Sequence, residues 1–397
     1  MYDTTMYALG AKRSAIRALF DYGQEQAAKV GKENVFDFSI GNPSIPAPNC
    51  VQDEIVRLAR EEAPAAIHGY TPAPGDPVVR QGVADYMNQT FQANVTGNNF
   101  YMTCGASASL AIILRALIAE NEDEIIVNAP FFPEYRVFIQ NAGGRLVMVP
   151  PDTEQFQLSM TGLAEAITSH TKAVIINTPN NPSGSVYSAD TLMKLGELLR
   201  CKSAEFGHPI FLISDEPYRE VIYDGLPVLY VPEFYKNTVI CYSYSKSLSL
   251  PGERVGYILV PNEVDGSREI FTAVCGSGRS MGFVCAPHLF QKVILACQGK
   301  TANIGIYDSN RKLIYHGLTD IGFQCVYPSG AFYLFVKAPD GDANQFMENA
   351  KKLNILIVPG DEFGCPGYCR ISYCVDPDMI RRSLPVFKQL YELYSHV

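Results

Sequence analysis

The chain has 397 residues, which corresponds to two or three domains at the usual size of roughly 100–200 residues. Hydrophobic residues make up 47% of it and charged residues 18%, so the composition is that of a folded globular protein and excludes the disordered and fibrous classes. The net charge of −9 is the wrong sign for a protein that coats nucleic acid or an anionic membrane. An anionic ligand must therefore be bound by local cationic groups.

The first half of the chain alternates short apolar runs with helical segments, which predicts an α/β core. A strand is expected at 34–40, then a rigid Pro- and Gly-rich loop at 41–48 and a helix at 53–62. A second helix at 107–119 precedes a strand at 124–127. Four further apolar runs are bounded by turns, as is typical of buried strands in a parallel or mixed sheet: 172–177, 210–214, 239–242 and 255–260.

Beyond about residue 290 the pattern changes and predicts a smaller α+β domain. A long helix is expected from residue 286 towards residue 314. Shorter elements follow it: 322–327, 332–337, a helix at 343–353, 355–359, 368–373 and a terminal helix. We therefore expect a large domain of residues 45–290 and a small domain that joins residues 1–44 to residues 291–397.

The location of the protein is predicted from its cysteines and its N-terminus. The 11 cysteines are scattered singly, without the spacing of a zinc site or of a small disulfide framework. The first residues, MYDTT, lack the basic and apolar regions of a signal peptide. The longest apolar stretch, near residues 110–119, is far shorter than the roughly 20 residues that span a bilayer. We expect a cytoplasmic protein without a structural metal and without membrane or nucleic-acid partners.

The most informative motif is CYSYSKSLSLPGERVG at residues 241–256. Lys246 lies among small hydroxyl residues after an apolar run, and Arg254 follows eight positions later. A lysine that attacks a carbonyl must be neutral, and a nearby cation lowers its pKa. The arginine suits a phosphate, to which it can donate two hydrogen bonds. A lone lysine in a serine-rich loop is more often a solvated surface residue, so the other motifs decide between the two interpretations.

Two polar motifs follow predicted buried strands. Asp215 comes directly after the run at 210–214, and ligands of α/β sheets bind at the carboxyl ends of strands. A carboxylate there can keep a heterocyclic nitrogen protonated. Asn181 lies in NTPNNPSG, where Pro182 holds it extended, and its amide suits a phenolate oxygen. The structural alternatives are a turn-capping aspartate and a turn-rich loop.

Residues 103–110, TCGASASL, open the predicted helix at 107–119. Small residues at a helix N-terminus expose free N–H groups to an anion. The motif is a weak signal by itself, and it is not the GxGxxG of dinucleotide-binding proteins. A nicotinamide-dependent enzyme is therefore disfavoured.

Together, in this order and at these separations, the motifs resemble those of the class I/II aminotransferases, pyridoxal-phosphate enzymes of fold type I. The resemblance runs from about residue 34 to residue 373. It implies a three-layer α/β/α large domain with a mostly parallel seven-stranded sheet, plus the smaller α+β domain. It also implies pyridoxal 5′-phosphate as the cofactor, ping-pong transfer of an amino group between an L-amino acid and a 2-oxo acid, and a homodimer with shared active sites.

The resemblance assigns roles to residues around the cofactor. Lys246 matches the Schiff-base lysine, which also moves the substrate proton, and Asp215 matches the partner of the pyridinium nitrogen. Tyr218 and Asn181 match the pair that binds the ring oxygen, so Lys246, Asp215 and Tyr218 are the implied catalytic residues. The positions that hold the phosphate in the family are occupied here by Gly105, Ala106, Ser107, Ser243 and Arg254.

Two aromatic residues have implied roles with plain alternatives. Phe132 falls where the family places a ring over the pyridine, although it or its neighbour Phe131 could be a core residue. Tyr70, in HGYTPAPG, resembles the tyrosine that reaches the phosphate of the other subunit. Its alternative is a loop aromatic packed on its own chain.

Substrate recognition follows from the resemblance only in part. Arg370, in YCRISY, together with Gly41 and Asn181, matches the residues that bind the α-carboxylate. A dicarboxylic substrate such as aspartate or glutamate needs a second cation, for which Arg17 and Arg279 are the candidates. The 23 Tyr and 21 Phe could equally line a pocket for aromatic amino acids, so the choice stays open.

Two other functions stay open at the level of sequence. A C–S β-lyase of the cystathionine β-lyase kind uses the same lysine and aspartate. A non-catalytic regulatory module could retain the cofactor site as a ligand-binding domain. Such regulators usually carry a fused DNA-binding domain, and this chain has neither the length nor a basic segment for one.

Overall fold

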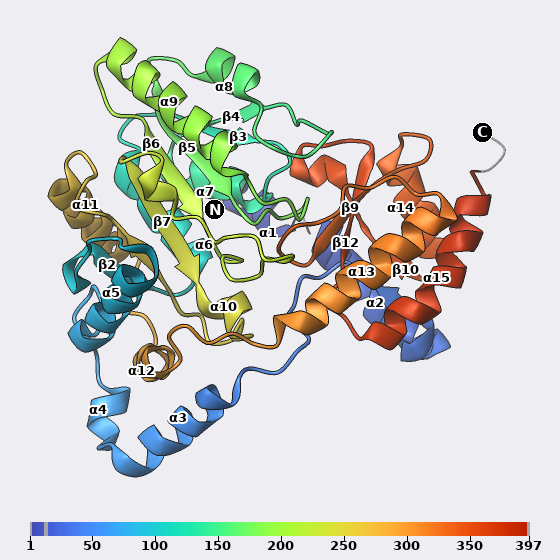
Figure 1. Ribbon diagram of the computed structural model, residues 1–397, viewed down its shortest axis with the longest axis horizontal. Coiled ribbons are helices and arrows are strands. Elements are labelled where there is room, and N and C mark those ends of the chain that lie inside the picture. Colours follow the sequence, from blue (N-terminus) through green and yellow to red (C-terminus); the bar gives the residue numbers. More distant parts are fainter. Residues whose placement is uncertain (1, 12–14, 395–397) are drawn as a thin grey trace.

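The computed structural model describes residues 2–11 and 15–394. Within these residues a seven-stranded sheet forms the centre of the larger part of the molecule (Figure 1), with the strand order β2-β8-β7-β6-β5-β3-β4. Its strands are β2 (Phe100–Thr103), β3 (Glu124–Asn128), β4 (Arg145–Val149), β5 (Thr171–Asn177), β6 (Phe211–Asp215), β7 (Thr238–Ser243) and β8 (Gly256–Leu259). Strand β8 runs antiparallel to both of its neighbours, and the other pairs are parallel. The predicted mostly parallel sheet is confirmed.

Helices cover both faces of this sheet. Ile125 and Val127 of β3 pack with helices of one face, whereas Ile126 between them packs with helices of the other. The first face carries α6 (Ala106–Leu117), α7 (Glu134–Ala142) and α11 (Ser267–Ser280). The opposite face carries α3 (Asn49–Glu61), α4 (Pro64–His68), α5 (Pro77–Phe91), α8 (Met160–Ala166), α9 (Ala189–Phe206) and α12 (His288–Ala296). Burial on both faces explains why the strands are continuous apolar runs, and the three-layer prediction is confirmed.

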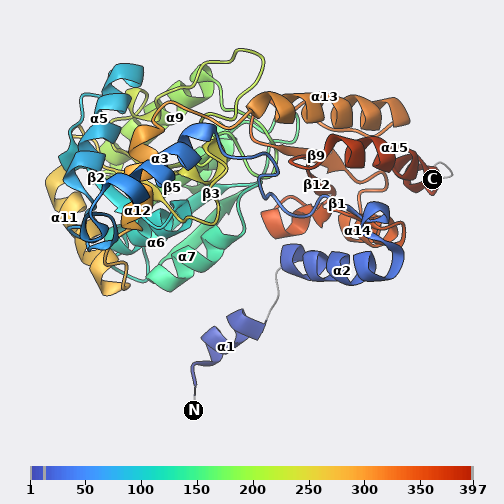
Figure 2. The ribbon, with the colours of Figure 1, turned by 90° about the horizontal axis from the view of Figure 1, so that it is seen from below.

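The smaller part of the molecule is built on short strands. A three-stranded antiparallel sheet has the order β11-β12-β9, and a separate parallel pair joins β1 to β10. These strands are β1 (Phe36–Asp37), β9 (Tyr333–Lys337), β10 (Ile355–Leu356), β11 (Val358–Pro359) and β12 (Tyr368–Ser372). The helices of this part are α2 (Ala15–Val30), α13 (Ile304–Ile321), α14 (Ala343–Lys352) and α15 (Pro377–Glu392). The N-terminal helix α1 (Thr4–Ala11) buries no residue and projects away from the body (Figure 2).

The hydrophobic cores of the two parts of the molecule show to which part the segments near the predicted domain boundaries belong. Phe36, Phe38 and Ile45 of the N-terminal segment belong to the core of the smaller part. Val293 and Ile294 of α12 belong instead to a core of the larger part. The division of the chain into domains at residues 45 and 290 stays a proposal. This packing favours a boundary nearer to residue 300 as the place where the chain passes from the large domain back to the small one.

Several predicted elements differ from those observed. The long helix expected from residue 286 is two helices, α12 and α13, because Gly299 adopts a φ of +71° between them. No helix or strand forms at residues 322–327, where a single bridge joins Cys325 to Val336. The run at 355–359 is divided between β10 and β11, which pair in two different sheets. In the described part of the chain, no helix is both long and apolar enough to cross a membrane.

Candidate active site

A cavity of about 280 Å³ lies where the carboxyl ends of three neighbouring parallel strands meet the smaller part of the molecule. Strands β5, β6 and β7 end at Asn177, Asp215 and Ser243, and all three residues line this cavity. Parallel strands bring their ends to one edge of a sheet, so polar residues that terminate successive strands converge there. The smaller part closes the other side with Tyr333 and Arg370.

Most of the predicted site residues meet at this cavity. The lining includes Gly41, Ala106, Ser107, Phe132, Asn181, Asp215, Tyr218, Ser243, Lys246, Arg254 and Arg370. Gly105 lies directly before α6, at its N-cap. The remaining three candidates lie elsewhere: Tyr70 is 90% exposed, Arg279 is exposed at the end of α11, and Arg17 lines a neighbouring groove.

Lys246 lies on α10 (Tyr244–Ser247), a single helical turn that follows β7 directly. Its Nζ donates a hydrogen bond of 2.7 Å to the carbonyl oxygen of Gly41. Burial lowers the pKa of Lys246 to about 8; Cys374 opposes this shift, and the positive charges of Arg370 and Arg254 add to it. A larger fraction of this amine is neutral near neutral pH than of an ordinary lysine, so it can act as a nucleophile and as a base.

Asp215 is buried, and its two carboxylate oxygens differ in their surroundings. Oδ2 accepts a hydrogen bond of 2.6 Å from the hydroxyl of Tyr135, whereas Oδ1 has no hydrogen-bond partner within the described residues. Burial raises the pKa of Asp215 to about 7, the bond from Tyr135 opposes this shift, and the charge of Glu216 adds to it. A buried acceptor without a partner suits a ligand that brings a protonated nitrogen.

Tyr218 and Arg370 form the side of the cavity next to the smaller part. The hydroxyl of Tyr218 lies 2.8 Å from that of Tyr333, and both rings are buried. Arg370 donates to Oδ1 of Asn181 at 3.0 Å and to the carbonyl of Ser39 at 2.5 Å, while its buried Nε has no partner among the described residues. An arginine with donors to spare in a buried cavity suits a carboxylate.

Gly41 leaves room for these groups. A Cβ at this position would overlap the hydroxyl of Tyr333, so any larger residue would displace that ring. The carbonyl of Gly41 is also the acceptor for Lys246. This glycine therefore keeps the backbone of the loop at 41–48 close to both the lysine and the tyrosine.

Another part of the cavity lining has the chemistry of an anion site. Ala106 and Ser107 form the first turn of the 12-residue helix α6, whose N–H groups point out of the helix end. Arg254 lies beside them: it donates to the hydroxyl of Ser245 at 3.3 Å, and a Cβ on Gly105 would come within 2.5 Å of its Nη2. A cation, hydroxyl groups and a helix N-terminus together suit a phosphate.

Sequence reasoning did not single out several residues that line this cavity or support it, among them Tyr135, Tyr333 and Ser245. Tyr135 supports Asp215, Tyr333 contacts Tyr218, and the hydroxyl of Ser245 lies between Ser243 and Arg254. Tyr333 lies in the apolar run AFYLFV, and Tyr135 lies beside Phe131, Phe132 and Phe138, so neither could be distinguished from a core aromatic. Ser245 had a signal, its place beside Lys246 in the serine-rich motif.

The cavity fits pyridoxal 5′-phosphate by its donor set. The anion site suits the phosphate, the unpartnered oxygen of Asp215 suits the ring nitrogen, and Lys246 in the same cavity suits the carbonyl. Phe132 lines the same space with an aromatic ring. Tyr218 and Asn181 remain as polar groups for the ring oxygen.

Comparisons with known proteins agree with this chemistry. Residues 33–386 match the family model described as aminotransferase class I and II. The structure is similar to an amino transferase from Eubacterium rectale, with 56% identity, a TM-score of 0.98 and coverage of 100% of this chain and 99% of that one. It is also similar to the aspartate aminotransferase of Thermus thermophilus solved with maleate, with 25% identity, a TM-score of 0.86 and coverage of 98% and 100%.

A probable aspartate aminotransferase from Methanocaldococcus jannaschii is 29% identical over an alignment of 393 residues, with coverage of 96% of this chain and 98% of that protein. These relatives support an aminotransferase over the C–S lyase and the regulatory module. Fold, cavity and relatives lead to one conclusion: the chain belongs to the class I and II aminotransferases and is a pyridoxal-phosphate-dependent aminotransferase.

Proposed function

We propose that this aminotransferase acts on a dicarboxylic amino donor, aspartate above all, in a homodimer with shared active sites. The observation that carries amino-acid binding is the buried guanidinium of Arg370, which lines the cavity with a spare donor for the α-carboxylate. The choice of a dicarboxylic donor is supported by Arg17, which lines the groove next to this cavity. The names of the relatives support aspartate, and maleate, found with the Thermus thermophilus enzyme, is a four-carbon dicarboxylate.

The proposed roles divide the reaction among the residues of the cavity. When bound, pyridoxal phosphate supplies the carbonyl that takes up the amino group and a ring that withdraws electrons from the substrate. Lys246 moves the proton of the substrate Cα, and Asp215 holds the proton of the ring nitrogen. The other lining residues orient the two molecules: Asn181 and Tyr218 at the ring oxygen, Phe132 over the ring, Gly105, Ala106, Ser107, Ser243 and Arg254 at the phosphate, and Gly41 with Arg370 at the α-carboxylate.

A second carboxylate needs another cation. The basic residues that line the cavity, Lys246, Arg254 and Arg370, already have roles. Arg17 lines a groove that meets the cavity at Ile16, a residue that lines both spaces. Arg17 is therefore our candidate for the distal carboxylate, whereas Arg279 could act only across a subunit interface from the exposed end of α11.

The exposure of Tyr70 supports the homodimer. Its loop is anchored to α12, because the two ring nitrogens of His288 lie 3.0 Å from the carbonyl of Gly69 and 3.1 Å from Oδ2 of Asp76. A tyrosine that is 90% exposed on an anchored loop has little contact with its own chain, which suits a role in the active site of a second subunit. The cytoplasm stays the proposed location, and the 11 free cysteines support it.

A panel of amino donors tests the substrate. Aspartate and glutamate should convert the bound cofactor to its amine form, as followed by absorbance, and Arg17→Met should raise the KM for aspartate about 100-fold while changing that for alanine little. The matched variant Arg279→Met should leave both values unchanged. Conversion by aromatic donors alone would refute the dicarboxylate proposal, and loss of aspartate binding in Arg279→Met would assign the cation to the partner subunit.

Complementation tests the shared sites. Tyr70→Ala and Lys246→Ala are each expected to be impaired. Mixed dimers of the two variants contain one intact site, so random mixing should restore on the order of one quarter of the wild-type sites. Mixtures no more active than the separate variants would exclude a site shared in this way.

A further inference from the structure

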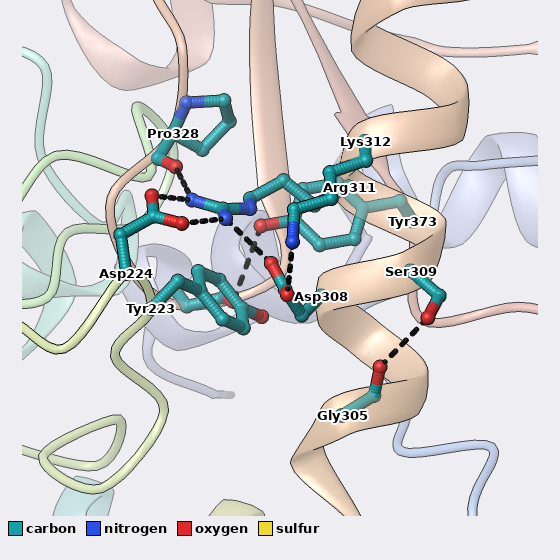
Figure 3. Close-up of polar contacts among 10 residues, drawn as sticks. Tyr223, Asp224, Gly305, Asp308, Ser309, Arg311, Lys312, Pro328 and Tyr373 are labelled. Carbon is teal, nitrogen blue, oxygen red and sulfur yellow. Dashed lines mark hydrogen bonds and ion pairs between the residues drawn. The ribbon is translucent and has the colours of Figure 1, made fainter.

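A buried arginine outside the cavity joins three segments of the chain (Figure 3). The side chain of Arg311, on α13, is fully buried and binds both oxygens of Asp224, at 2.8 Å each. It also donates to the carbonyl of Pro328 at 2.8 Å and to Asp308 on its own helix. Its guanidinium is stacked between Tyr223 and Tyr327, 4.3 Å and 4.5 Å from the ring centroids. The two rings cover both faces of this cation and both of its Nη atoms bind protein oxygens, whereas its buried Nε has no hydrogen-bond partner among the described residues.

The segments that Arg311 joins form a seam between the two parts of the molecule. Residues 218–224 follow β6 of the large sheet, and residues 328–333 lead into β9 of the small sheet. Backbone hydrogen bonds hold them together: Ala331 donates to Val221 at 2.8 Å, and Tyr223 donates to Ser329 at 3.1 Å. The hydroxyl of Tyr223 adds a bond to the carbonyl of Ala331. Arg311 thus fixes one end of a short two-stranded contact.

The other end of the seam is the active site. Tyr218 and Tyr333 are the first and last residues of the two segments, and their hydroxyls are 2.8 Å apart. The ring of Tyr333 lies 4.8 Å from the guanidinium of Arg370, the proposed carboxylate receptor. Since both segments are only six or seven residues long and are joined by hydrogen bonds, we expect a displacement at Asp224 or Pro328 to reach this tyrosine pair.

We infer that Arg311 is a positioning residue for amino-donor binding. By holding the two segments of the seam together, it keeps the hydroxyl of Tyr333 next to that of Tyr218 and the ring of Tyr333 next to Arg370. This inference rests on the proposed role of Arg370. Arg311 does not touch the substrate, so its loss affects the placement of the binding groups rather than the groups themselves. A lysine at position 311 would keep the positive charge. It lacks the planar guanidinium whose separate N–H groups bind both Asp224 and Pro328.

The test compares Arg311→Met with Lys312→Met in the holoenzyme. Lys312 is the matched control, because it lies on the same helix and contacts the same Asp308, at 2.7 Å, but is half exposed. Arg311→Met should raise the donor KM about tenfold or more with kcat changed less than about threefold, and Lys312→Met should change neither. Hydrogen exchange of the amides of Tyr223 and Ala331, measured by mass spectrometry, should be about tenfold faster only in Arg311→Met.

A double-mutant cycle separates positioning from stability. Tyr333→Phe should raise the donor KM in the wild-type background but change it much less in Arg311→Met, since the pair is already displaced. If Arg311→Met does not fold, Arg311→Lys takes its place with the same expected pattern. An unchanged donor KM, an equal effect in Lys312→Met or additive effects with Tyr333→Phe would overturn the inference. Absence of transamination in the wild-type enzyme would instead refute the proposed function, while hydrogen exchange would still report on the seam.

Discussion

Tyr135 supports Asp215 through a buried hydrogen bond of 2.6 Å, and the two residues come from different strand–helix units of the large sheet. Tyr135 lies on the first turn of α7, three residues after Phe132 of the cavity lining. Donation to Oδ2 stabilises the ionised carboxylate, whereas burial favours the neutral acid and raises the pKa to about 7. The bond therefore favours the charged form of Asp215, which its proposed role at the ring nitrogen of the cofactor requires.

Removal of the Tyr135 hydroxyl should slow catalysis. In Tyr135→Phe the carboxylate loses its donor, its pKa rises further, and we expect kcat to fall about tenfold, the equivalent of one buried hydrogen bond to a charged group. Steady-state kinetics with aspartate measure this effect. The control is Tyr235→Phe, which removes a buried bond of 2.6 Å to the carbonyl of Ile210, away from the cavity lining. Equal losses of kcat in both variants would contradict the specific role of Tyr135.

Asp215 should make the stability of the cofactor-free protein depend on pH. The folded protein keeps this proton up to about pH 7, whereas an unfolded chain releases it near the ordinary value of 3.8. The folded state binds more protons between these values, so stability falls as the pH rises. Between pH 5 and 8 the free energy of unfolding should fall by about 3 kcal/mol relative to Asp215→Asn.

Denaturant titrations at several pH values measure this difference. Asp265→Asn is the control, because Lys236 holds the pKa of Asp265 below its usual range and it does not titrate in this interval. A wild-type slope equal to that of Asp215→Asn would show that the buried carboxylate is not the group that titrates.

The rate at which cofactor-free protein takes up pyridoxal phosphate should report the pKa of Lys246. Only the neutral amine attacks a carbonyl, so the rate of covalent incorporation should rise about tenfold per pH unit from pH 6 and level off above about pH 8. Stopped-flow absorbance follows the reaction. Lys246→Ala should bind the cofactor without this covalent phase. A midpoint near 10.5, the ordinary value for lysine, would mean that burial does not shift this group.

Arg370 should act on binding more than on turnover. The variant Arg370→Met lacks the proposed charged bond to the α-carboxylate and also the observed bonds to Asn181 and to the carbonyl of Ser39. We expect the donor KM to rise at least about 100-fold, and Arg370→Lys, which keeps the charge, to recover only part of it. Steady-state kinetics with saturating 2-oxo acid test this. A variant that loses kcat at unchanged KM would place Arg370 in the chemical step instead.

Five of the seven strands of the large sheet were predicted, because the inner strands are buried on both faces, whereas the two edge strands, β2 and β4, were not. Runs such as 172–177 contain few polar residues, and each strand ends close to where its apolar run ends. The break between α12 and α13 was missed because a single glycine within a helical pattern is often tolerated, so Gly299 alone did not predict it. Helix α2, which buries Leu19 and Gly23, was not predicted.

The site residues were predictable where motifs follow strands, as at Asp215 and Lys246. Tyr135 and Tyr333 were not, because a core aromatic and an aromatic with a functional hydroxyl have the same sequence pattern. The pairs they form span 80 and 115 residues, and no local rule predicts contacts over such separations. Tyr70 and Arg279 lie outside the cavity of their own chain, so their roles stay predictions.

The parallel pair of β1 and β10 has a consequence for synthesis of the protein. Phe36 pairs with Ile355 and Asp37 with Leu356. The early strand β1 therefore cannot form its backbone pairing until the late strand β10 has been synthesised. At roughly 5–20 residues per second, the intervening chain takes on the order of 15–60 s to emerge from the ribosome. All strands of the large sheet are synthesised during this interval. The loop that carries Gly41, the acceptor for Lys246, follows β1 directly, and β1 is held by β10 only after residue 355 has been added. Ribosome-bound chains that end before residue 355 should therefore hold a folded sheet but no complete active site.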